Sequence, residues 1–173
     1  MPRYDIPKAA PEPLRRVQLF VNSVDLSHGR EWIGEWLERE GVVPTRTAVA
    51  RAQEVREALR ELLYENNRQP GGADPHPVLE AAAEAARLSV DFRRGELVAR
   101  ARGVDGAIGR VLAVAYAAMR DGSFARLKAC RNHDCRWAFY DYSKNRSASW
   151  CSMQLCGNRT KTRAYRRRHA GRS

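Results

Sequence analysis

All four cysteines of the chain lie between residues 130 and 156, in two pairs of equal spacing. Cys130 and Cys135 form one C-x4-C pair, Cys151 and Cys156 form another, and fifteen residues separate the pairs. Two close pairs across such a gap can present four thiolates to one tetrahedral metal ion, because each pair turns tightly and the spacer returns the chain. The spacing therefore predicts one structural Zn²⁺ held by these four side chains.

Other uses of clustered thiols are disulfides, a redox or iron–sulfur site, and four unrelated buried cysteines. A reducing cytosol disfavours disulfides, and nothing else in the sequence indicates electron transfer. His133 lies inside the first pair and could replace one cysteine, although four thiolates already complete the shell. A closed four-thiolate shell leaves no position for water or substrate, so the predicted zinc is structural and not catalytic.

Positive charge is concentrated in the same part of the chain. The formal net charge is +11. Residues 1–120 carry 18 Lys and Arg against 17 Asp and Glu, whereas residues 121–173 carry 13 against 3, a net of +10. A basic block of this density on a folded element attracts phosphates. The alternative is a solvated tail that aids solubility.

The residues after Cys156 are predicted to form a basic helix. The stretch "GNRTKTRAYRRRH" contains no proline, and helical spacing would distribute its cations nearly all round the axis. Such a helix cannot pack an apolar face deeply, so contact with an anionic partner such as the major groove of DNA is favoured. Arginine can pair with guanine, and asparagine with adenine. The predicted nucleic-acid contacts are Asn158, Arg159, Lys161, Arg163, Arg166 and Arg167.

Between the cysteine pairs, alternating side chains predict two short strands. Trp137 and Phe139 alternate with Ala138 and Tyr140, and a turn is expected near residues 143–145. The aromatic side chains are expected to pack a small core around the metal, since a segment of this size cannot form one otherwise. The sequence thus predicts a small ββα, treble-clef-like finger over residues 125–169.

The rest of the chain is predicted to be a helical domain with one β-hairpin, which gives an α+β, mainly α, fold class. Four prolines make residues 1–13 a predicted flexible lead-in, and the helical domain is expected over residues 14–122. Apolar periodicity and turn residues define its elements. They are helices over 14–26, 29–41, 45–67, 78–88 and 104–122, and a hairpin over 88–101 that turns at Arg94 and Gly95.

No catalytic motif is recognisable in the helical domain. It contains no G-x-S-x-G, no H-E-x-x-H and no glycine-rich phosphate loop, so we do not expect an enzyme. Trp32 and Trp36 could line a ligand pocket, but their i, i+4 spacing favours the core. His76 is expected in a loop. The domain could sense a small-molecule effector or form a dimer, and an enzyme that uses the finger as a docking arm is the alternative.

The sequence also bears on the compartment. No apolar run approaches the roughly 20 residues that a membrane-spanning helix needs, and the first residues contain no apolar segment of a secretory signal. We therefore expect a cytoplasmic protein without a membrane partner.

Residues Cys156, Gly157, Asn158 and Arg159 complete a pattern that resembles the CGNR zinc finger family. The resemblance spans about residues 125–169 and includes the C-x4-C pair, "FYDYSKN", "WCSM" and "CGNR" with basic residues after it. The N-terminal part, with "LFVNSVD", resembles the ABATE domain that precedes this finger. The resemblance implies a bacterial transcriptional regulator whose finger binds DNA and whose N-terminal domain senses a ligand or stress signal.

One departure from the family pattern concerns the loop before Trp150. This chain has Ser143, Lys144 and Asn145, and then "SASWC", where the family has more arginine. The helix after Cys156 is therefore the better candidate for phosphate contact than this loop.

Two functions compete with DNA binding. An RNA-binding protein would use Trp137, Phe139 and Tyr140 to stack on bases. A zinc-stabilised module that binds an acidic protein is the second alternative.

Overall fold

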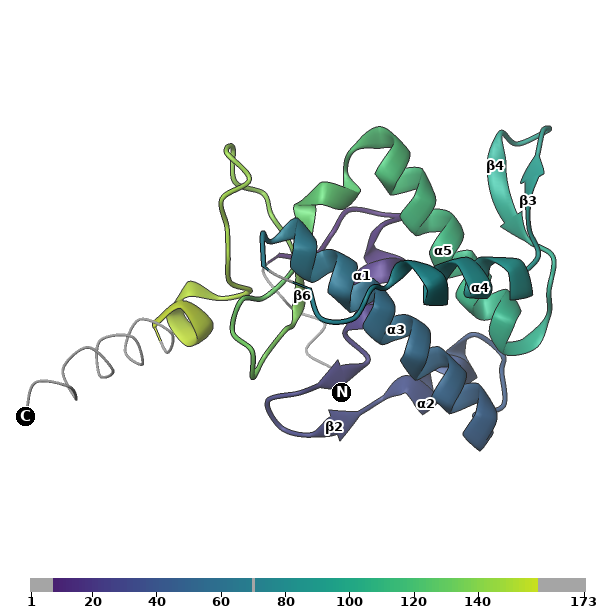
Figure 1. Ribbon diagram of the computed structural model, residues 1–173, viewed down its shortest axis with the longest axis horizontal. Helices are drawn as coiled ribbons and strands as arrows, with labels where there is room; N and C mark the ends of the chain where they lie inside the picture. The colour runs from purple at the N-terminus through teal and green to yellow at the C-terminus, as the bar shows by residue number, and fades with distance from the viewer. Residues whose placement is uncertain (1–7, 70, 159–173) are drawn as a thin grey trace, which may run out of the picture.

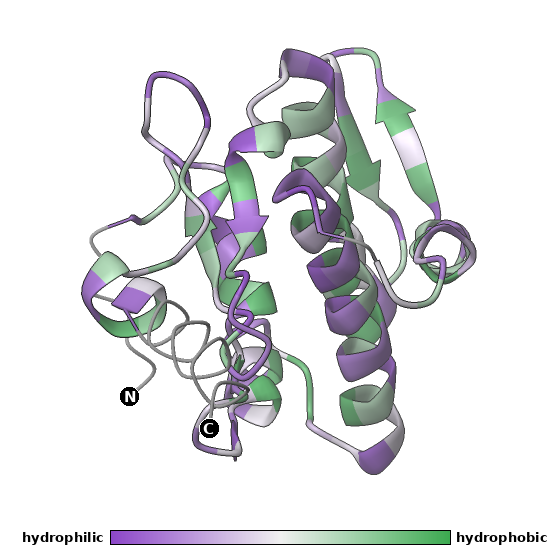
Figure 2. Cartoon of the chain, turned by 60° about the vertical axis from the view of Figure 1, so that its left-hand side comes forward, coloured by the Kyte–Doolittle hydropathy of each residue, from purple (hydrophilic) through white to green (hydrophobic). Residues whose placement is uncertain are grey.

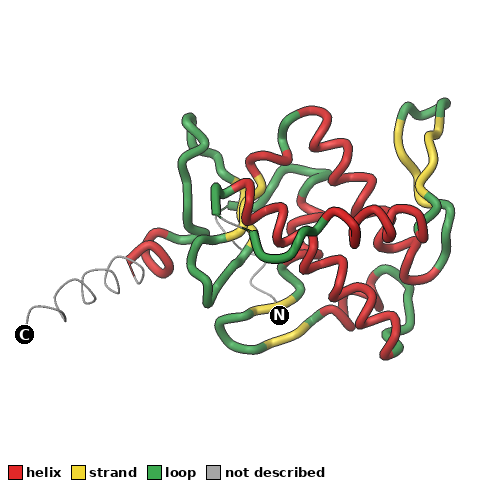
Figure 3. The backbone as a smooth tube through the Cα atoms, in the orientation of Figure 1, coloured by secondary structure: helices red, strands yellow, loops and turns green. Residues whose placement is uncertain are grey.

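We analysed a computed structural model of the chain, which describes residues 8–69 and 71–158. The predicted fold class is confirmed, because helices form most of the regular secondary structure and the strands form three small antiparallel pairs (Figures 1 and 3). No helix in these two ranges is long and apolar enough to span a membrane. The elements are α1 (Arg15–Val21), β1 (Val24–Asp25), β2 (Arg30–Glu31), α2 (Ile33–Arg39), α3 (Arg46–Asn66), α4 (His76–Ala85), β3 (Leu88–Asp91), β4 (Glu96–Ala99), α5 (Gly103–Asp121), η1 (Phe124–Arg126), β5 (Leu127–Ala129), β6 (Ala138–Tyr140) and η2 (Met153–Gly157).

The long helix α3 runs through the centre of the fold and was predicted with nearly these bounds. The Thr45 hydroxyl caps it by accepting a 3.2 Å hydrogen bond from the backbone N–H of Ala48. Its apolar stripe, which includes Val55, Leu59 and Leu63, is buried in the core. Figure 2 shows hydrophobic and hydrophilic residues alternating around the long helices, as burial of one face requires.

The first two predicted helices are shorter than expected. Residues 22–26 and 29–31 leave the helices, because Val24 pairs with Glu31 and Asp25 with Arg30 in the strand pair β1–β2. Two-residue strands give no usable alternation in a sequence, so this pair was not predicted. Trp36 is 9% exposed and lies 4.5 Å from the Phe20 ring centroid, which confirms that it is a core residue.

The prediction that His76 lies in a loop was wrong. His76 is the first residue of α4, which begins two residues earlier than expected, and its Nδ1 lies 2.7 Å from an Asp74 carboxylate oxygen. Prolines flank it, and the first turn of a helix tolerates proline because its N–H groups have no partner within the helix.

The hairpin β3–β4 and the helix α5 confirm the predictions for residues 88–122. Leu88 pairs with Ala99 and Asp91 with Glu96. The helix α5 packs closely on this hairpin, since a Cβ atom at Gly109 would lie 2.6 Å from the Cβ of Ala99. A side chain at position 109 would clash with Ala86 and Ala99, so glycine permits the close approach of the helix and the hairpin.

The strand pair β5–β6 belongs to the main core of the helical part. Leu127 and Ala129 of β5 are fully buried on α3, and Ala138 and Tyr140 of β6 join the same apolar cluster as α1 and α5. The division into residues 14–122 and 125–169 remains a prediction. Of the expected flexible lead-in, residues 8–10 pack against the fold, since Ala10 is 4% exposed and the Lys8 carbonyl accepts from the Tyr140 N–H at 2.9 Å, whereas residues 11–13 are exposed.

The predicted strand pairing around residues 143–145 was wrong. The strand β6 pairs with β5, and the loop that joins them carries Cys130 and Cys135. After Tyr140 the chain does not return as a second strand beside β6. The buried Asp141 carboxylate instead forms an ion pair with Lys128 of β5. The alternation itself was informative, since Phe139 faces the cysteines while its neighbours face the helical core.

Candidate metal centre

The four cysteine sulfur atoms lie together, and all the cysteines except Cys156 belong to loops or turns. All four Sγ atoms are within 4.8 Å of one another, and both Cys135–Cys151 and Cys151–Cys156 are separated by 3.7 Å. A tetrahedral zinc ion with Zn–S bonds of about 2.3 Å holds its sulfur ligands about 3.8 Å apart. The arrangement therefore fits one four-thiolate zinc ion.

Two tight turns present these sulfur atoms. In the first, the N–H of Cys135 donates to the Asn132 carbonyl at 2.9 Å, and Arg136 adopts a positive φ of 45°. In the second, the N–H of Cys156 donates to the Ser152 carbonyl at 3.0 Å. Each turn brings two cysteines of one pair to the same side, as the C-x4-C spacing predicted.

Two alternatives for the cysteines are excluded by the geometry. A disulfide needs an S–S separation of about 2.05 Å, and all four thiols are free. His133 does not belong to the group of ligand atoms that the four sulfurs form, and its Nδ1 lies 3.0 Å from the Tyr64 hydroxyl. Among the described residues, the four cysteines form the one group of three or more His, Cys, Asp or Glu side chains able to hold a metal.

The thiols are poised to lose protons to a metal. Thiol donors, Cys135 first and then Cys151, lower the pKa of Cys130 to about 4, and backbone N–H groups act in the same direction. The same bonds to Cys130 raise the pKa values of Cys135 and Cys151. The Cys130 thiolate thus has its donors in place, and a bound cation would favour loss of the protons of Cys135 and Cys151.

A small apolar cluster surrounds the sulfur atoms. Cys130 and Cys156 are buried, Phe139 is fully buried against them, and Trp150 packs at the edge. The Asn132 amide lies 3.7 Å from the Cys156 sulfur as a hydrogen-bond donor. This packing and donor arrangement fixes the ligand side chains from outside the metal shell.

The aromatic residues between the cysteine pairs are structural. Trp137, Phe139 and Tyr140 are 8%, 0% and 8% exposed. In these positions they have no open face on which a base could stack.

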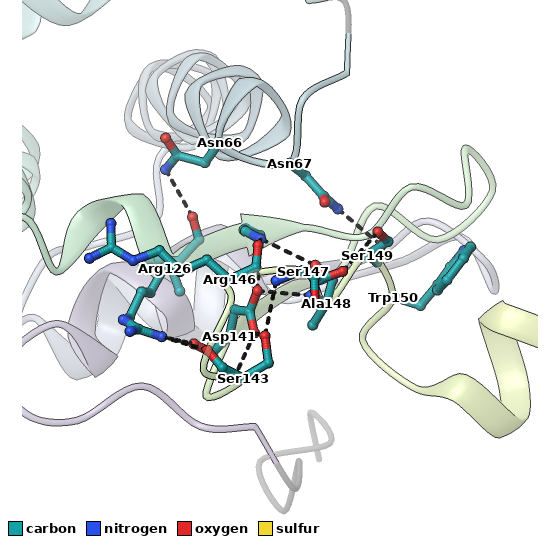
Figure 4. A network of polar contacts seen from close by, with 12 residues as sticks. Asn66, Asn67, Arg126, Asp141, Ser143, Arg146, Ser147, Ala148, Ser149 and Trp150 are labelled. Carbon is teal, nitrogen blue, oxygen red and sulfur yellow. Dashed lines mark hydrogen bonds and ion pairs between the residues drawn. The ribbon is translucent and has the colours of Figure 1, made fainter.

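A row of α3 side chains attaches the metal centre to the helical part. Asn67, at the C-cap of α3, donates to the carbonyl of Ala129 at 2.8 Å. It also donates to the carbonyl of Ser149 at 2.9 Å (Figure 4). Ala129 precedes Cys130, and Ser149 lies two residues before Cys151. One buried amide therefore holds the approach to both cysteine pairs.

Buried arginines make further links. The Arg60 guanidinium is fully buried and donates to the carbonyls of Arg136 and Val21 at 2.9 and 2.6 Å, and to the Glu57 carboxylate at 2.9 Å. Arg136 itself is paired with the Glu61 carboxylate. The sequence did not predict this network, because Val21 and Arg136, whose carbonyls Arg60 binds, lie far from it in the sequence.

A second buried ion pair holds the loop that follows β6. The Asp141 carboxylate accepts hydrogen bonds from Lys128 Nζ at 2.7 Å and from the Ser143 hydroxyl at 2.6 Å. Burial alone would raise the pKa of Asp141, but the hydrogen bonds from Lys128 and Ser143 outweigh it and lower the pKa. The carboxylate is therefore ionised and saturated with donors at neutral pH.

The predicted nucleic-acid residues lie at and beyond the end of the described structure. Asn158 is exposed and directly follows the helical turn η2, in which the Ser152 hydroxyl accepts from the N–H of Leu155 at 3.3 Å. Cys156 belongs to this same turn. The other predicted contacts, Arg159, Lys161, Arg163, Arg166 and Arg167, lie outside the described residues.

Comparison with known families decides the type of metal site. Residues 126–169 match the CGNR zinc finger. The match covers the strands β5 and β6 and all four cysteines, and confirms the resemblance predicted for this segment. No curated protein matched the chain significantly. The resemblance of the N-terminal part to the ABATE domain remains a prediction.

The cysteines of this CGNR zinc finger thus form the site of one structural zinc ion. Their thiolates would fill all four tetrahedral positions, and zinc with a filled shell stabilises the local fold. A zinc ion bound here would cross-link the β5–β6 loop to the turn η2 and would have a structural role.

Proposed function

We propose that this chain is a DNA-binding regulatory protein of the cytoplasm, in which the zinc finger fixes the start of a basic DNA-contacting segment. The observation that supports it best is the position of Cys156. This metal-site residue lies in the turn η2, two residues before Asn158, where the basic segment begins. A bound zinc would therefore fix the position of Asn158, the residue from which that segment continues.

The composition of the segment suits a polyanion. Residues 158–173 contain seven cationic residues and no acidic residue. If six of the cations neutralise phosphates of duplex DNA, the plot of log Kobs against log salt concentration has a slope of about −5. Discrimination between sequences would add about 1–3 kcal/mol for each arginine that reads a base.

The proposal is tested by fluorescence anisotropy with duplex DNA fragments at several salt concentrations. The variant Arg166→Ala/Arg167→Ala should bind more weakly and with a shallower salt slope. The matched control is Arg93→Ala/Arg94→Ala at the exposed end of the β3–β4 hairpin, which removes the same charge. An equal loss of DNA affinity in both variants would mean that binding depends only on the net charge of the chain. Absence of salt-dependent DNA binding by the native chain would refute the proposal.

RNA and acidic proteins are the competing partners. Single-stranded RNA is less favoured, because the three aromatic side chains that would stack on its bases are buried. A competition experiment between duplex DNA and single-stranded RNA separates these partners. Preference for RNA, or binding to an acidic protein without nucleic-acid affinity, would contradict the proposal.

In this proposal the helical part is the regulatory portion and has no catalytic role. A groove of about 630 Å³ between the β3–β4 hairpin and α5 could accept a small effector, with Val90, Leu97 and Tyr116 among its lining residues. The part of such a ligand that contacts these side chains would be apolar. Thermal-shift screening of small apolar compounds, with Tyr116→Ala as the comparison variant, tests this part separately.

A further inference from the structure

The loop of residues 142–147, between β6 and the second cysteine pair, is a candidate for a second contact surface. Lys144, Asn145 and Arg146 are exposed at its end. Neither Lys144 nor Arg146 forms an ion pair with a carboxylate of the described part of the chain, and residues 142–158 contain no acidic residue. The loop therefore presents two cations whose charge is not balanced locally.

The backbone of this loop is held in one conformation by buried polar groups. The Lys128 ammonium, paired with Asp141, also donates to the carbonyl of Arg146 at 2.6 Å. The Asp141 carboxylate accepts the N–H groups of Ser143 and Ala148 at 2.9 and 3.0 Å, which ties both ends of the loop to the same carboxylate (Figure 4).

Further hydrogen bonds fix the backbone of this loop. Arg126 donates through Nη1 to the carbonyls of Asp141 and Ser143, each at 3.0 Å (Figure 4). Within the loop, the N–H of Ser147 donates to the Ser143 hydroxyl at 3.0 Å, and Arg146 adopts a positive φ of 50°. This is far more ordering than a solvated connection between two elements requires.

Preorganisation has a direct consequence for binding. A loop that is already fixed loses little backbone entropy when it meets a ligand, so more of the interaction energy of its cations appears as affinity. The Lys128–Asp141 pair is neutral as a unit, so it fixes the loop without cancelling the charges of Lys144 and Arg146. The chemistry presented is that of a phosphate contact.

We propose that the loop of residues 142–147 is a second phosphate-binding surface for the same DNA, with Lys144 and Arg146 each neutralising a backbone phosphate. The inference rests on the proposed DNA-binding function. The loop and the turn η2 that precedes the basic segment both lie at the end of the molecule opposite the β3–β4 hairpin (Figure 1). A duplex on that end can meet both. The proposal gives the loop a part in phosphate contact beside the segment after Cys156, which the sequence made the better candidate.

The test is the salt dependence of duplex DNA binding by the variant Lys144→Ala/Arg146→Asn. Asparagine is chosen because it tolerates the positive φ at position 146. Loss of two phosphate contacts should make the slope of log Kobs against log salt less negative by about 1.8. Zinc stoichiometry and melting temperature should not change, because both side chains are exposed.

The controls separate failure of this inference from failure of the proposed function. If the native chain binds DNA and Arg166→Ala/Arg167→Ala weakens binding, a loop variant that behaves like Arg93→Ala/Arg94→Ala overturns the loop contact alone. If the native chain does not bind DNA, both proposals fall. The single variant Lys144→Ala, which touches no strained backbone position, should reduce the slope by about 0.9.

Discussion

Replacement of Asn67 by alanine should weaken both the fold and the metal site. The Asn67 side chain is 2% exposed, and its amide donates to one carbonyl next to each cysteine pair, those of Ala129 and Ser149. Alanine supplies neither bond. Because both carbonyl groups lie in the interior, the variant removes two donors from places that water reaches poorly.

The magnitude follows from the number of bonds lost. The Ser149 carbonyl keeps the hydrogen bond from the Arg131 N–H at 3.1 Å, so the Ala129 carbonyl is the buried acceptor that loses its donor. A buried acceptor left without a donor costs about 1–3 kcal/mol, and we expect a loss of this size in the free energy of unfolding. For a chain of this size, that corresponds to a fall in melting temperature of about 3–10 °C. The zinc should also leave faster, because both ligand turns lose a fixed point.

The assay is thermal denaturation followed by circular dichroism, together with zinc release to a chromophoric chelator. The control is Asn145→Ala in the exposed loop, which should change the melting temperature by less than about 2 °C. An Asn67→Ala variant with native melting temperature and native zinc release would refute the idea that α3 holds the metal centre.

Two further outcomes are expected. Phe139→Ala removes a fully buried ring beside the sulfur atoms, so unfolding should become easier by about 3–5 kcal/mol, whereas Phe92→Ala, at a side chain that is 91% exposed, should have little effect in the same denaturant titration. Burial would raise the pKa of Glu57, but the charges of Arg60 and Arg56 outweigh it and lower that pKa. The ionised Glu57 carboxylate contributes its full stabilisation above the pKa of the unfolded state, and this stabilisation is lost as pH falls below about 4.5. The Glu57→Gln variant should therefore lose less stability than the native chain over that pH range. An equal loss in both proteins would contradict a stabilising role of the Glu57 carboxylate.

Much of the fold could be predicted from the sequence because its helices are long and periodic. The helix α3 has a threonine cap and a regular apolar stripe, and its bounds followed from these. Strand pairs of two or three residues carry no comparable signal. The strand β5 pairs with β6 and packs on α3. Contacts between segments so far apart in the sequence cannot be predicted from the local pattern of apolar and polar residues.

The metal centre was predictable for a different reason. The cysteine side chains have few roles in a reducing compartment, and their spacing alone limits the geometry. The polar side chains that position the cysteine turns without binding the metal could not be predicted from the sequence. Asn67, Arg60 and Asp141 are polar residues whose burial depends on partners far away in the sequence, such as Ser149, Val21 and Lys128.

The polar contacts between α3 and the finger imply that the two parts respond to each other. The Tyr64 hydroxyl contacts His133 and Arg60 binds the carbonyl of Arg136, so the first cysteine turn packs on the last two turns of α3. Loss of zinc should therefore lower the stability of the helical part as well as that of the finger.

The central claim is that zinc, held by the four cysteines, fixes the start of the DNA-contacting segment. It is tested most directly by zinc content measured by mass spectrometry, paired with anisotropy titration of duplex DNA before and after chelation. The account predicts one zinc ion per chain and loss of most DNA affinity on chelation, with recovery when zinc is restored. Full DNA affinity in metal-free protein, or a chain that binds no zinc, would contradict it.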